Sequence, residues 1–200
     1  MPNERLIVFV KAPRPGEVKT RVAQTTGADR ACDVYRQLVA ILLKSLSPLR
    51  EIELRFTPDD AAAEIEPWLR PGWVAVPQGD GDLGARLERA FTDAFAAGAE
   101  RVVIVGSDCP DVKTSDVRMA WRELQTHDVA VGPAMDGGYW LIGLRAPQPE
   151  LFREIPWSSD LVLGRTLERA RTRGLKIQLL RILSDIDTEA DWNAYVRGGE

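Results

Sequence analysis

Residues 6–10 read LIVFV and are followed at once by KAPRPGEVKTR (residues 11–21), and this junction decides the fold. The first stretch is a continuous apolar run rich in β-branched side chains, which is the pattern of a strand buried on both faces of a parallel sheet. A basic loop with two prolines then ends the strand. Because ligands of open α/β sheets bind beyond the carboxyl ends of the strands, this loop is where chemistry is first expected.

Similar apolar runs recur along the chain and alternate with amphipathic helical patterns. We expect further strands at residues 52–57, 73–76, 101–106, 130–133, 138–144 and 176–180, and helices at 34–42, 83–95, 114–126, 158–174 and around 192–195. This alternation predicts an α/β fold with a mostly parallel sheet covered by helices. The pair 130–133 and 138–144, which a turn-like stretch separates, predicts one antiparallel strand.

Polar residues mark the expected helix ends. Thr114 or Ser115 is expected to cap the helix over residues 114–126. Ser158 or Ser159 is expected to cap the next helix, which Gly174 should stop.

Length and composition bound the class of protein. With 200 residues, 44% hydrophobic and 28% charged, the chain is expected to fold as one domain over residues 1–200. A net charge of −4 argues against a sequence-independent nucleic-acid binder. The first apolar run is too short for a signal segment or a membrane span, so the protein is expected in the cytoplasm.

Cysteine and histidine are too sparse to supply the chemistry. Cys32 and Cys109 lie far apart without a CxxC spacing, so two free thiols are expected rather than a disulfide or a zinc site. The only histidine, His127, falls at the end of an expected helix and is interpreted as structural. Any reaction must therefore rest on carboxylates, lysines and arginines.

The basic loop offers the first candidate site. It carries Lys11, Arg14, Lys19 and Arg21, and cations with backbone amides near a helix start favour a diphosphate or triphosphate. The loop matches neither GxxxxGK[ST] nor GxGxxG. The alternative is a solvated basic loop whose prolines only fix its path.

Two acidic stretches follow later strands. In GSDCPD (106–111), Asp108 projects just past a strand end, where a carboxylate can hold Mg²⁺ or Mn²⁺ on phosphate oxygens. Alternatively, Asp108 and Asp111 form a turn or a helix cap. In SDIDT (184–188), Asp185 and Asp187 point to the same side of an extended chain and could complete the metal shell.

The C-terminal acidic stretch also has a simpler interpretation. Asp187 or Thr188 could cap the last helix instead of binding a metal.

Two glycine-rich stretches complete the candidate loops. In GPAMDGGYW (132–140), paired glycines after Asp136 permit close approach of a ligand, or simply form an Asp-Gly hairpin turn. In PQGDGDLGAR (77–86), Gln78 and nearby backbone groups could read the edge of a nucleobase. The alternative there is a flexible acidic turn with a helix cap at Asp82.

Six stretches, in this order and context, resemble the bacterial DUF2064 family along nearly the whole chain. They are KAPRPGEVKTR (11–21), QGDGDLGARL (78–87), GSDCPD (106–111), GPAMDGGYWLIGL (132–144), IPWSS (155–159) and DIDT (185–188). The family is described as glycosyltransferase-like and related to the molybdenum-cofactor and phospholactate guanylyltransferases. The resemblance implies the GT-A fold of nucleotide-diphospho-sugar transferases, a Rossmann-like three-layer sandwich with a mostly parallel mixed sheet.

The resemblance also implies roles for individual residues. The nucleotide would be held by Lys11, Ala12, Pro13, Gly16, Lys19, Arg21, Gln78 and Gly84, with the last two near the base. A metal would be held by Asp108, Asp185 and Asp187, and the acceptor or sugar side would be lined by Asp136, Gly137 and Gly138. Lys19, Asp108 and Asp136 are the implied catalytic residues. The strand-end motif departs from the DxD pair frequent in GT-A enzymes, because Asp108 is followed by Cys109 and Pro110 and the next acid is Asp111.

The leading functional hypothesis is metal-dependent transfer of a sugar from a nucleotide-diphospho-sugar to a small acceptor, with Mg²⁺ or Mn²⁺ as cofactor. One alternative is a guanylyltransferase-like nucleotidyltransferase acting on a small phosphorylated substrate. A second alternative is a nucleotide-binding module without catalysis. In each case the expected ligands are small molecules, and neither nucleic acid nor a membrane is an expected partner.

Overall fold

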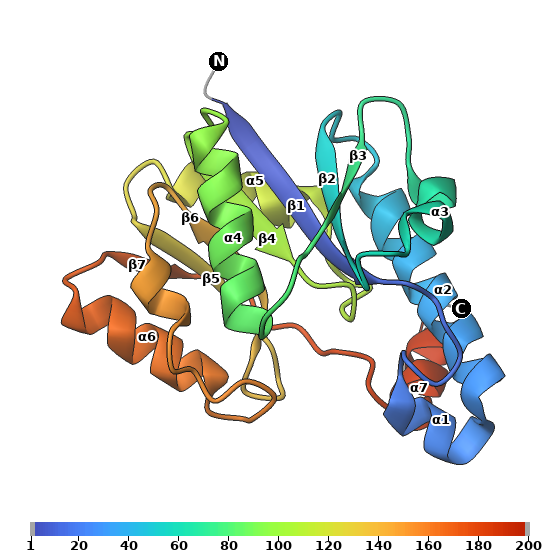
Figure 1. The fold of residues 1–200 in the computed structure, drawn as a ribbon. Helices are drawn as coiled ribbons and strands as arrows, with labels where there is room; N and C mark the ends of the chain where they lie inside the picture. Colours follow the sequence, from blue (N-terminus) through green and yellow to red (C-terminus); the bar gives the residue numbers. More distant parts are fainter. Residues whose placement is uncertain (1–2, 199–200) are drawn as a thin grey trace.

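The computed structural model describes residues 3–198 and is built on one seven-stranded sheet with helices on both faces (Figure 1). The strands are β1 (Glu4–Lys11), β2 (Ile52–Thr57), β3 (Val74–Pro77), β4 (Arg101–Val105), β5 (Val129–Pro133), β6 (Tyr139–Leu144) and β7 (Ile177–Leu179). The helices are α1 (Thr20–Thr26), α2 (Ala28–Leu46), α3 (Ala62–Ile65), α4 (Leu83–Ala96), α5 (Thr114–Glu123), α6 (Val162–Thr172) and α7 (Glu189–Gly198). Two 3₁₀ turns, η1 (Glu66–Trp68) and η2 (Pro149–Phe152), complete the elements.

The sheet is mixed and mostly parallel, as the sequence predicts. Its order is β3-β2-β1-β4-β6-β5-β7, and β6 runs antiparallel to both of its neighbours. The remaining pairs are parallel. The carboxyl ends of β1, β2, β3, β4, β5 and β7 therefore meet at one edge, which also receives the turn between β5 and β6.

The sheet divides the core into two halves. Strand β1 is apolar throughout because it packs against both halves. Leu6 and Val8 pack on one face with α2 and α5, whereas Ile7 and Phe9 pack on the other face with α4 and η2. Leu6, Ile7 and Val8 are fully buried. A strand covered on both faces has no solvent side, which explains the continuous apolar run.

A third, smaller core joins the two ends of the chain. Val22 of α1 and Leu38 of α2 pack with Ile186 and Trp192, the latter from α7. Docking of α7 carries the stretch 184–188 back to the basic loop, and Figure 1 shows α1 and α7 side by side. Helices α1 and α7 are therefore neighbours in space, although most of the sequence lies between them.

Three expected caps are confirmed and two are wrong. The Thr188 hydroxyl accepts from the amide of Asp191 and caps α7. The Asp82 carboxylate accepts from the amide of Ala85 and caps α4, and Gly174 follows α6 with a φ of 69°. Helix α5 begins one residue earlier than expected, because Lys113 is its N-cap and Asp116 accepts from the Lys113 amide. Leu161 is the N-cap of α6.

The serines before α6 lie close to the helix but are not its N-cap. The Ser159 hydroxyl accepts from the amide of Leu161, so it stabilises the turn before α6 rather than the helix itself.

Helices α1 and α3 were not expected, because they are short and lack a long apolar period. Within the described part of the chain, no helix has both the length and the apolar character to cross a membrane.

Candidate active site

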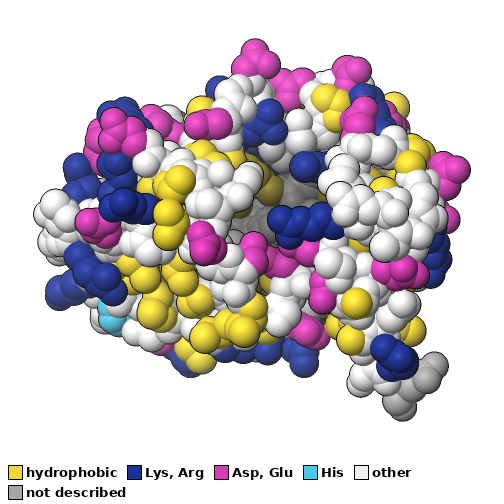
Figure 2. Space-filling view, turned by 90° about the horizontal axis from the view of Figure 1, so that it is seen from below, with side chains coloured by type: hydrophobic (Ala, Val, Ile, Leu, Met, Phe, Trp, Pro, Cys, Tyr) yellow, Lys and Arg dark blue, Asp and Glu magenta, His cyan; other side chains and the backbone are white. Residues whose placement is uncertain are grey.

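The loops beyond the carboxyl ends of the strands surround a hollow on one face of the molecule. Figure 2 looks onto this edge and shows Lys and Arg side chains on one side of the hollow, with Asp and Glu side chains facing them. This segregation of charge suits a ligand that is itself anionic and is accompanied by a cation.

Lys19 lies at the centre of the charged groups. Its ammonium nitrogen is 2.5 Å from Asp108 Oδ1, donates to the carbonyl oxygen of Ile186 at 2.5 Å, and is 3.5 Å from Asp187 Oδ1. Only 5% of the side chain is exposed. The backbone of Lys19 is left-handed, with φ 47° and ψ 49°, which costs a non-glycine residue roughly 1–2 kcal/mol. Lys19 thus joins the start of α1 to two distant acidic loops.

The second cation of this cluster is Arg21. Its guanidinium lies 3.2 Å from Asp187 Oδ2, so Asp187 faces a different cation on each of its two oxygens. Arg21 is largely exposed, and an ion pair of this kind contributes about 0–1 kcal/mol to stability. Arg21 remains accessible from solvent at the margin of the site.

Asp185 differs sharply from Asp187, two residues later. It accepts a hydrogen bond from the Cys109 thiol at 2.5 Å. Burial raises the pKa of Asp185 to about 6, the thiol hydrogen bond opposes the rise, and Asp108, Asp136 and Asp187 add to it through their negative charge. The raised pKa of Asp185 therefore reflects its burial first and the negative charge of the neighbouring loops second.

The donors present fit a hard divalent cation in kind, because they are carboxylate oxygens. In the described residues 3–198, however, no three His, Cys, Asp or Glu side chains are arranged to share one metal ion. The ammonium of Lys19 lies between Asp108 and Asp187 instead, and Asp185 is hydrogen-bonded to Cys109. Asp108, Asp185 and Asp187 stay a predicted ligand set.

The turn between β5 and β6 places Asp136 at the same edge. Asp136 Oδ1 accepts from the amide of Gly138 at 2.9 Å, which is the simple turn that the sequence allows. Gly137 has a φ of 88°, and a Cβ atom there would lie 2.3 Å from the carbonyl oxygen of Asp160. Gly137 is thus required by the close contact with the segment before α6.

Residues of the basic loop divide among several environments. Lys11 is exposed, whereas Ala12 is buried. Arg14 turns away from the carboxylates of the site and pairs with Asp60 and Glu64. The carbonyl oxygen of Pro13 accepts from the Cys32 thiol, and Gly16 lies at an exposed turn with a φ of 84°.

The Gln78 side chain bonds to protein groups in this structure, and its base-reading role stays a prediction. Gln78 is 4% exposed, and its amide nitrogen donates to the carbonyl oxygens of Val10 and Arg55. Its amide oxygen accepts from Arg86 at 3.4 Å. Both hydrogens of the amide therefore hold neighbouring strands together at this edge.

Gly84 lies at a close contact between α4 and the segment that contains Trp157, and its place near the base stays a prediction. Gly84 is buried, and a Cβ atom there would lie 2.4 Å from the Phe152 carbonyl oxygen and 2.8 Å from Trp157 Nε1. Its missing side chain lets α4 pack against the segment that contains Trp157. The IPWSS stretch therefore completes the core beside α4.

Two polar residues at this edge were missed by sequence analysis. Tyr35 and Ser107 are buried and hydrogen-bonded to each other. Tyr35 occupies an apolar position of an amphipathic helix, so the sequence pattern predicts a core residue there. The position of Ser107 next to Asp108 was the only available signal.

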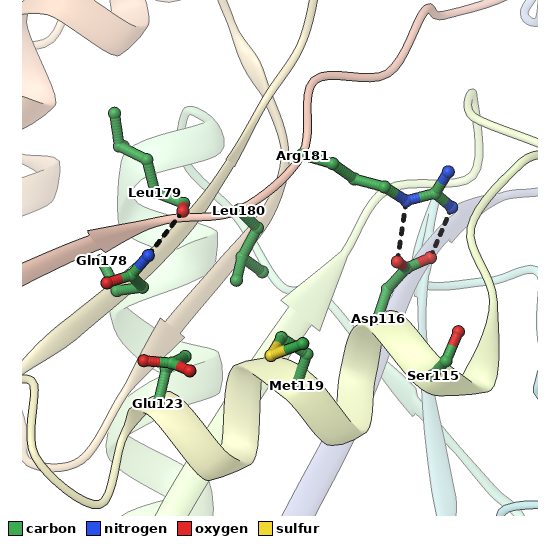
Figure 3. Close-up of a pocket in the computed structure, with 8 residues that line it drawn as sticks. All are labelled: Ser115, Asp116, Met119, Glu123, Gln178, Leu179, Leu180 and Arg181. Carbon is green, nitrogen blue, oxygen red and sulfur yellow. Dashed lines mark hydrogen bonds and ion pairs between the residues drawn. The ribbon is translucent and has the colours of Figure 1, made fainter.

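A separate cavity of about 340 Å³ lies between α5 and β7. Figure 3 shows Arg181 at one end, where its guanidinium donates to both oxygens of Asp116. Arg181 also donates to the carbonyl oxygen of Asp111. These bonds fix the start of α5 and the end of the Asp108-containing loop, so this region supports the site from outside.

Comparison with known proteins agrees with this geometry. Residues 44–159 match the model of DUF2064, described as an uncharacterized protein conserved in bacteria. The chain belongs to the DUF2064 family. A crystal structure from Desulfovibrio desulfuricans G20, described provisionally as a nucleotide-diphospho-sugar transferase, superposes on this DUF2064 protein with a TM-score of 0.93. It is 37% identical, and the match covers 100% of this chain and 89% of that chain.

Two curated proteins are also similar to this DUF2064 protein. A phosphoenolpyruvate guanylyltransferase of Sphaerobacter thermophilus is 25% identical over 189 residues, covering 92% of this chain and 89% of the relative. A 3-phospho-D-glycerate guanylyltransferase of Phenylobacterium zucineum is 32% identical over 123 residues, covering 57% of this chain and 55% of the relative. The expected family and the nucleotide-diphospho-sugar transferase fold are thus confirmed.

Proposed function

We propose that this DUF2064 protein is a nucleotidyltransferase that joins a guanylyl group from GTP to the phosphate of a small phosphorylated acid. The observation that carries the proposal is the meeting of Asp108, Asp187 and Lys19 at the carboxyl edge of the sheet. The names of the two curated relatives support guanylyl transfer and an acceptor that carries both phosphate and carboxylate groups. As the sequence predicts, the reaction is placed in the cytoplasm.

The proposed reaction is an in-line displacement at phosphorus. An oxygen of the acceptor phosphate attacks the α-phosphorus of GTP, the bond between that phosphorus and the bridging oxygen breaks, and pyrophosphate leaves. Negative charge grows on the leaving group, and positive groups aimed at it lower the barrier. Lys11, which is exposed, and Lys19 are the cations of the basic loop proposed for this role.

Metal dependence is part of the proposal. Carboxylates of Asp108, Asp185 and Asp187 would hold Mg²⁺ or Mn²⁺, which when bound neutralises phosphate charge and polarises the phosphorus centre. Burial is the main cause of the raised pKa of Asp185, and repulsion from Asp108, Asp136 and Asp187 adds to it. A nearby cation would relieve that repulsion, which supports such a role. Lys19 must then turn from Asp108 and Asp187, and phosphate oxygens are the anions that would receive its ammonium.

Asp136 and the Gly137–Gly138 turn are proposed to face the acceptor. Asp136 is exposed and close enough to Asp185 to affect its pKa. The turn is held rigid by the contact of Gly137 with the segment before α6. A rigid turn beside the carboxylates can hold an acceptor phosphate in the orientation that displacement requires.

Sugar transfer remains the second candidate, and the description of the Desulfovibrio desulfuricans G20 structure favours it. The same cations and carboxylates would then stabilise a departing nucleoside diphosphate. The two reactions share the nucleotide site and differ in the bond that breaks.

The products distinguish these reactions. We would incubate the protein with GTP, Mg²⁺ or Mn²⁺ and either phosphoenolpyruvate or 3-phosphoglycerate, and measure pyrophosphate release and the mass of the adduct. Parallel reactions with GDP-sugars would measure release of GDP. Pyrophosphate with a guanylylated acid supports the first proposal, and GDP release supports the second. Failure of both assays in wild-type protein would contradict both.

A further inference from the structure

Tyr35 is a core residue of α2 whose hydroxyl reaches the edge of the candidate site. It is 2% exposed, and its ring meets Trp68 edge-on with the ring centroids 6.4 Å apart. Aromatic packing of this kind fixes the ring and leaves the hydroxyl little freedom to move. The hydroxyl is therefore a fixed point in an otherwise apolar environment.

The Tyr35 hydroxyl connects two loops. The amide of Lys11 donates to the Tyr35 oxygen at 2.7 Å, and the Tyr35 and Ser107 hydroxyls are 3.1 Å apart. Lys11 begins the basic loop (residues 11–21), and Ser107 precedes Asp108 in the Asp108 loop (residues 106–111). One buried hydroxyl thus touches the loop proposed for nucleotide and the loop proposed for metal.

The Tyr35 hydroxyl joins β1 and β4 beyond the point where their backbone hydrogen-bond ladder ends. The last register pair between β1 and β4 is Val8 with Val105. Beyond it, the amide of Ala12 donates to β2 and the amide of Gly106 donates to β6. The two strand ends therefore follow different neighbours, and the amide of Lys11 finds its partner in Tyr35. Buried amides of this kind need a partner.

The hydroxyl can serve both partners at once. It accepts from the Lys11 amide through a lone pair and keeps its own proton for Ser107 Oγ. Burial raises the pKa of Tyr35, so this proton is retained. Ser107 is itself buried. Removing either hydroxyl would leave a buried polar group without its partner, which such sites tolerate poorly.

We propose that Tyr35 is a positioning residue that holds the basic loop and the Asp108 loop at a fixed separation and thereby couples nucleotide binding to metal binding. The ligands assigned to the two loops rest on the proposed function. The separation matters because a metal held by Asp108 and a phosphate held by Lys11 or Lys19 must be in contact with each other. Tyr35 acts through its two neighbours and touches neither ligand.

The test measures how strongly Mn²⁺ enhances binding of GTP. Titration calorimetry would give the affinity for GTP with Mn²⁺ and with EDTA for the wild type, Tyr35→Phe, Ser107→Ala and the double variant. Tyr195→Phe removes a hydroxyl in α7, where the ring stacks on Trp192, and serves as the matched control. Circular dichroism and thermal melts would establish that each variant is folded.

We expect Tyr35→Phe to lower the Mn²⁺ enhancement about tenfold, with Ser107→Ala giving a similar loss and the double variant little more, because the two hydroxyls act as one unit. Tyr195→Phe should match the wild type. Wild-type enhancement in a folded Tyr35→Phe or Ser107→Ala protein, or additive losses, would overturn the positioning role. If wild-type protein binds no GTP at all, the proposed function fails first, and the two failures are thereby distinguished.

Discussion

The basic loop and the acidic residues are arranged in opposite ways. Lys11, Arg14, Lys19 and Arg21 are close in sequence, yet the fold sends Arg14 to Asp60 and Glu64 and directs Lys19 between two carboxylates. Asp108 and Asp187 come from two loops far apart in sequence, and both lie beside the Lys19 ammonium. The cations are neighbours in sequence, but this did not predict that they gather in space. The position of the acids after strand ends did predict that they lie close together.

The largest expected effect is on the acidic side. Asp108→Asn keeps the shape of the side chain and removes the charge that faces Lys19. We expect guanylyl transfer to fall about 100- to 1,000-fold, the range found when one electrostatic group of an active site is removed. Steady-state rates of pyrophosphate release would measure it.

Asp111→Asn is the matched control, because Asp111 is exposed and lies in the same loop. It should retain wild-type rates. Equal losses in the two variants would show that the loop, rather than Asp108 itself, is needed.

The next largest effect is expected at Lys19 and distinguishes it from the other cations of the basic loop. Lys19→Met keeps the aliphatic stem and removes the ammonium from Asp108 and Asp187. We expect Mn²⁺ affinity without nucleotide to rise roughly tenfold or more, because a competing cation is lost. Affinity for GTP with Mn²⁺ should fall about tenfold, as expected when a charged hydrogen bond of about 1.5 kcal/mol is removed.

Titration calorimetry with Mn²⁺ alone and with GTP would measure both changes. Arg21→Met removes an exposed cation that pairs with Asp187 alone, so it should change Mn²⁺ affinity less than Lys19→Met does. Unchanged Mn²⁺ affinity in Lys19→Met would mean that the ammonium and the metal do not share these oxygens.

A third prediction concerns stability and pH. The folded protein holds the Asp185 proton more tightly than an unfolded chain does, because its pKa is raised from 3.8 to about 6. The stabilising contribution is complete below pH 3.8 and is lost as pH rises through 6, so ionised Asp185 is unfavourable at pH 8. Asp185→Asn should then stabilise the protein by about 1–3 kcal/mol at pH 8.

Urea unfolding in EDTA at pH 8 and at pH 4 would test this prediction. The gain in the free energy of unfolding should shrink toward zero at the lower pH, where the wild-type carboxyl is already protonated. An equal gain at both pH values would assign the effect to packing rather than to charge.

The smallest effect is expected at Arg14. Arg14→Met removes the ion pairs with Asp60 and Glu64 without touching the carboxylates around Lys19. Affinity for GTP should stay at the wild-type value, and only the melting temperature should fall slightly. Calorimetry and a thermal melt would measure them. A loss of GTP affinity as large as that of Lys19→Met would place Arg14 at the phosphates.

Most of the fold followed from local patterns, and the exceptions have physical causes. The apolar runs predicted the seven strands of the described sheet. The central strands are buried on both faces and cannot expose a polar face, whereas the edge strands β3 and β7 are partly exposed. The short helices α1 and α3 were missed, since their stability comes from contacts rather than from their own periodicity. The start of α5 was misplaced because the Asp116 carboxylate accepts from the Lys113 amide, and a search for a serine or threonine cap does not find this bond.

The candidate site was predicted less evenly. Asp108 was found from its position after a strand, and Asp185 and Asp187 from their alternation. The contacts of Gln78 were not predicted, because a polar side chain in such a loop can bond to neighbouring backbone, and those bonds depend on how β1, β2 and β3 pack. Tyr35 was hidden, because its position in α2 is apolar by every local measure.

The sequence alone determined the order of strands and helices and the loops that reach the binding edge, because periodicity and strand ends are local properties. The tertiary structure decided which charges meet. Docking of α7 on α1 and α2 brings Asp187 and the Ile186 carbonyl to Lys19, and divergence of β1 from β4 gives the Tyr35 hydroxyl two partners. Such contacts join residues far apart in the chain, and only the complete packing fixes them.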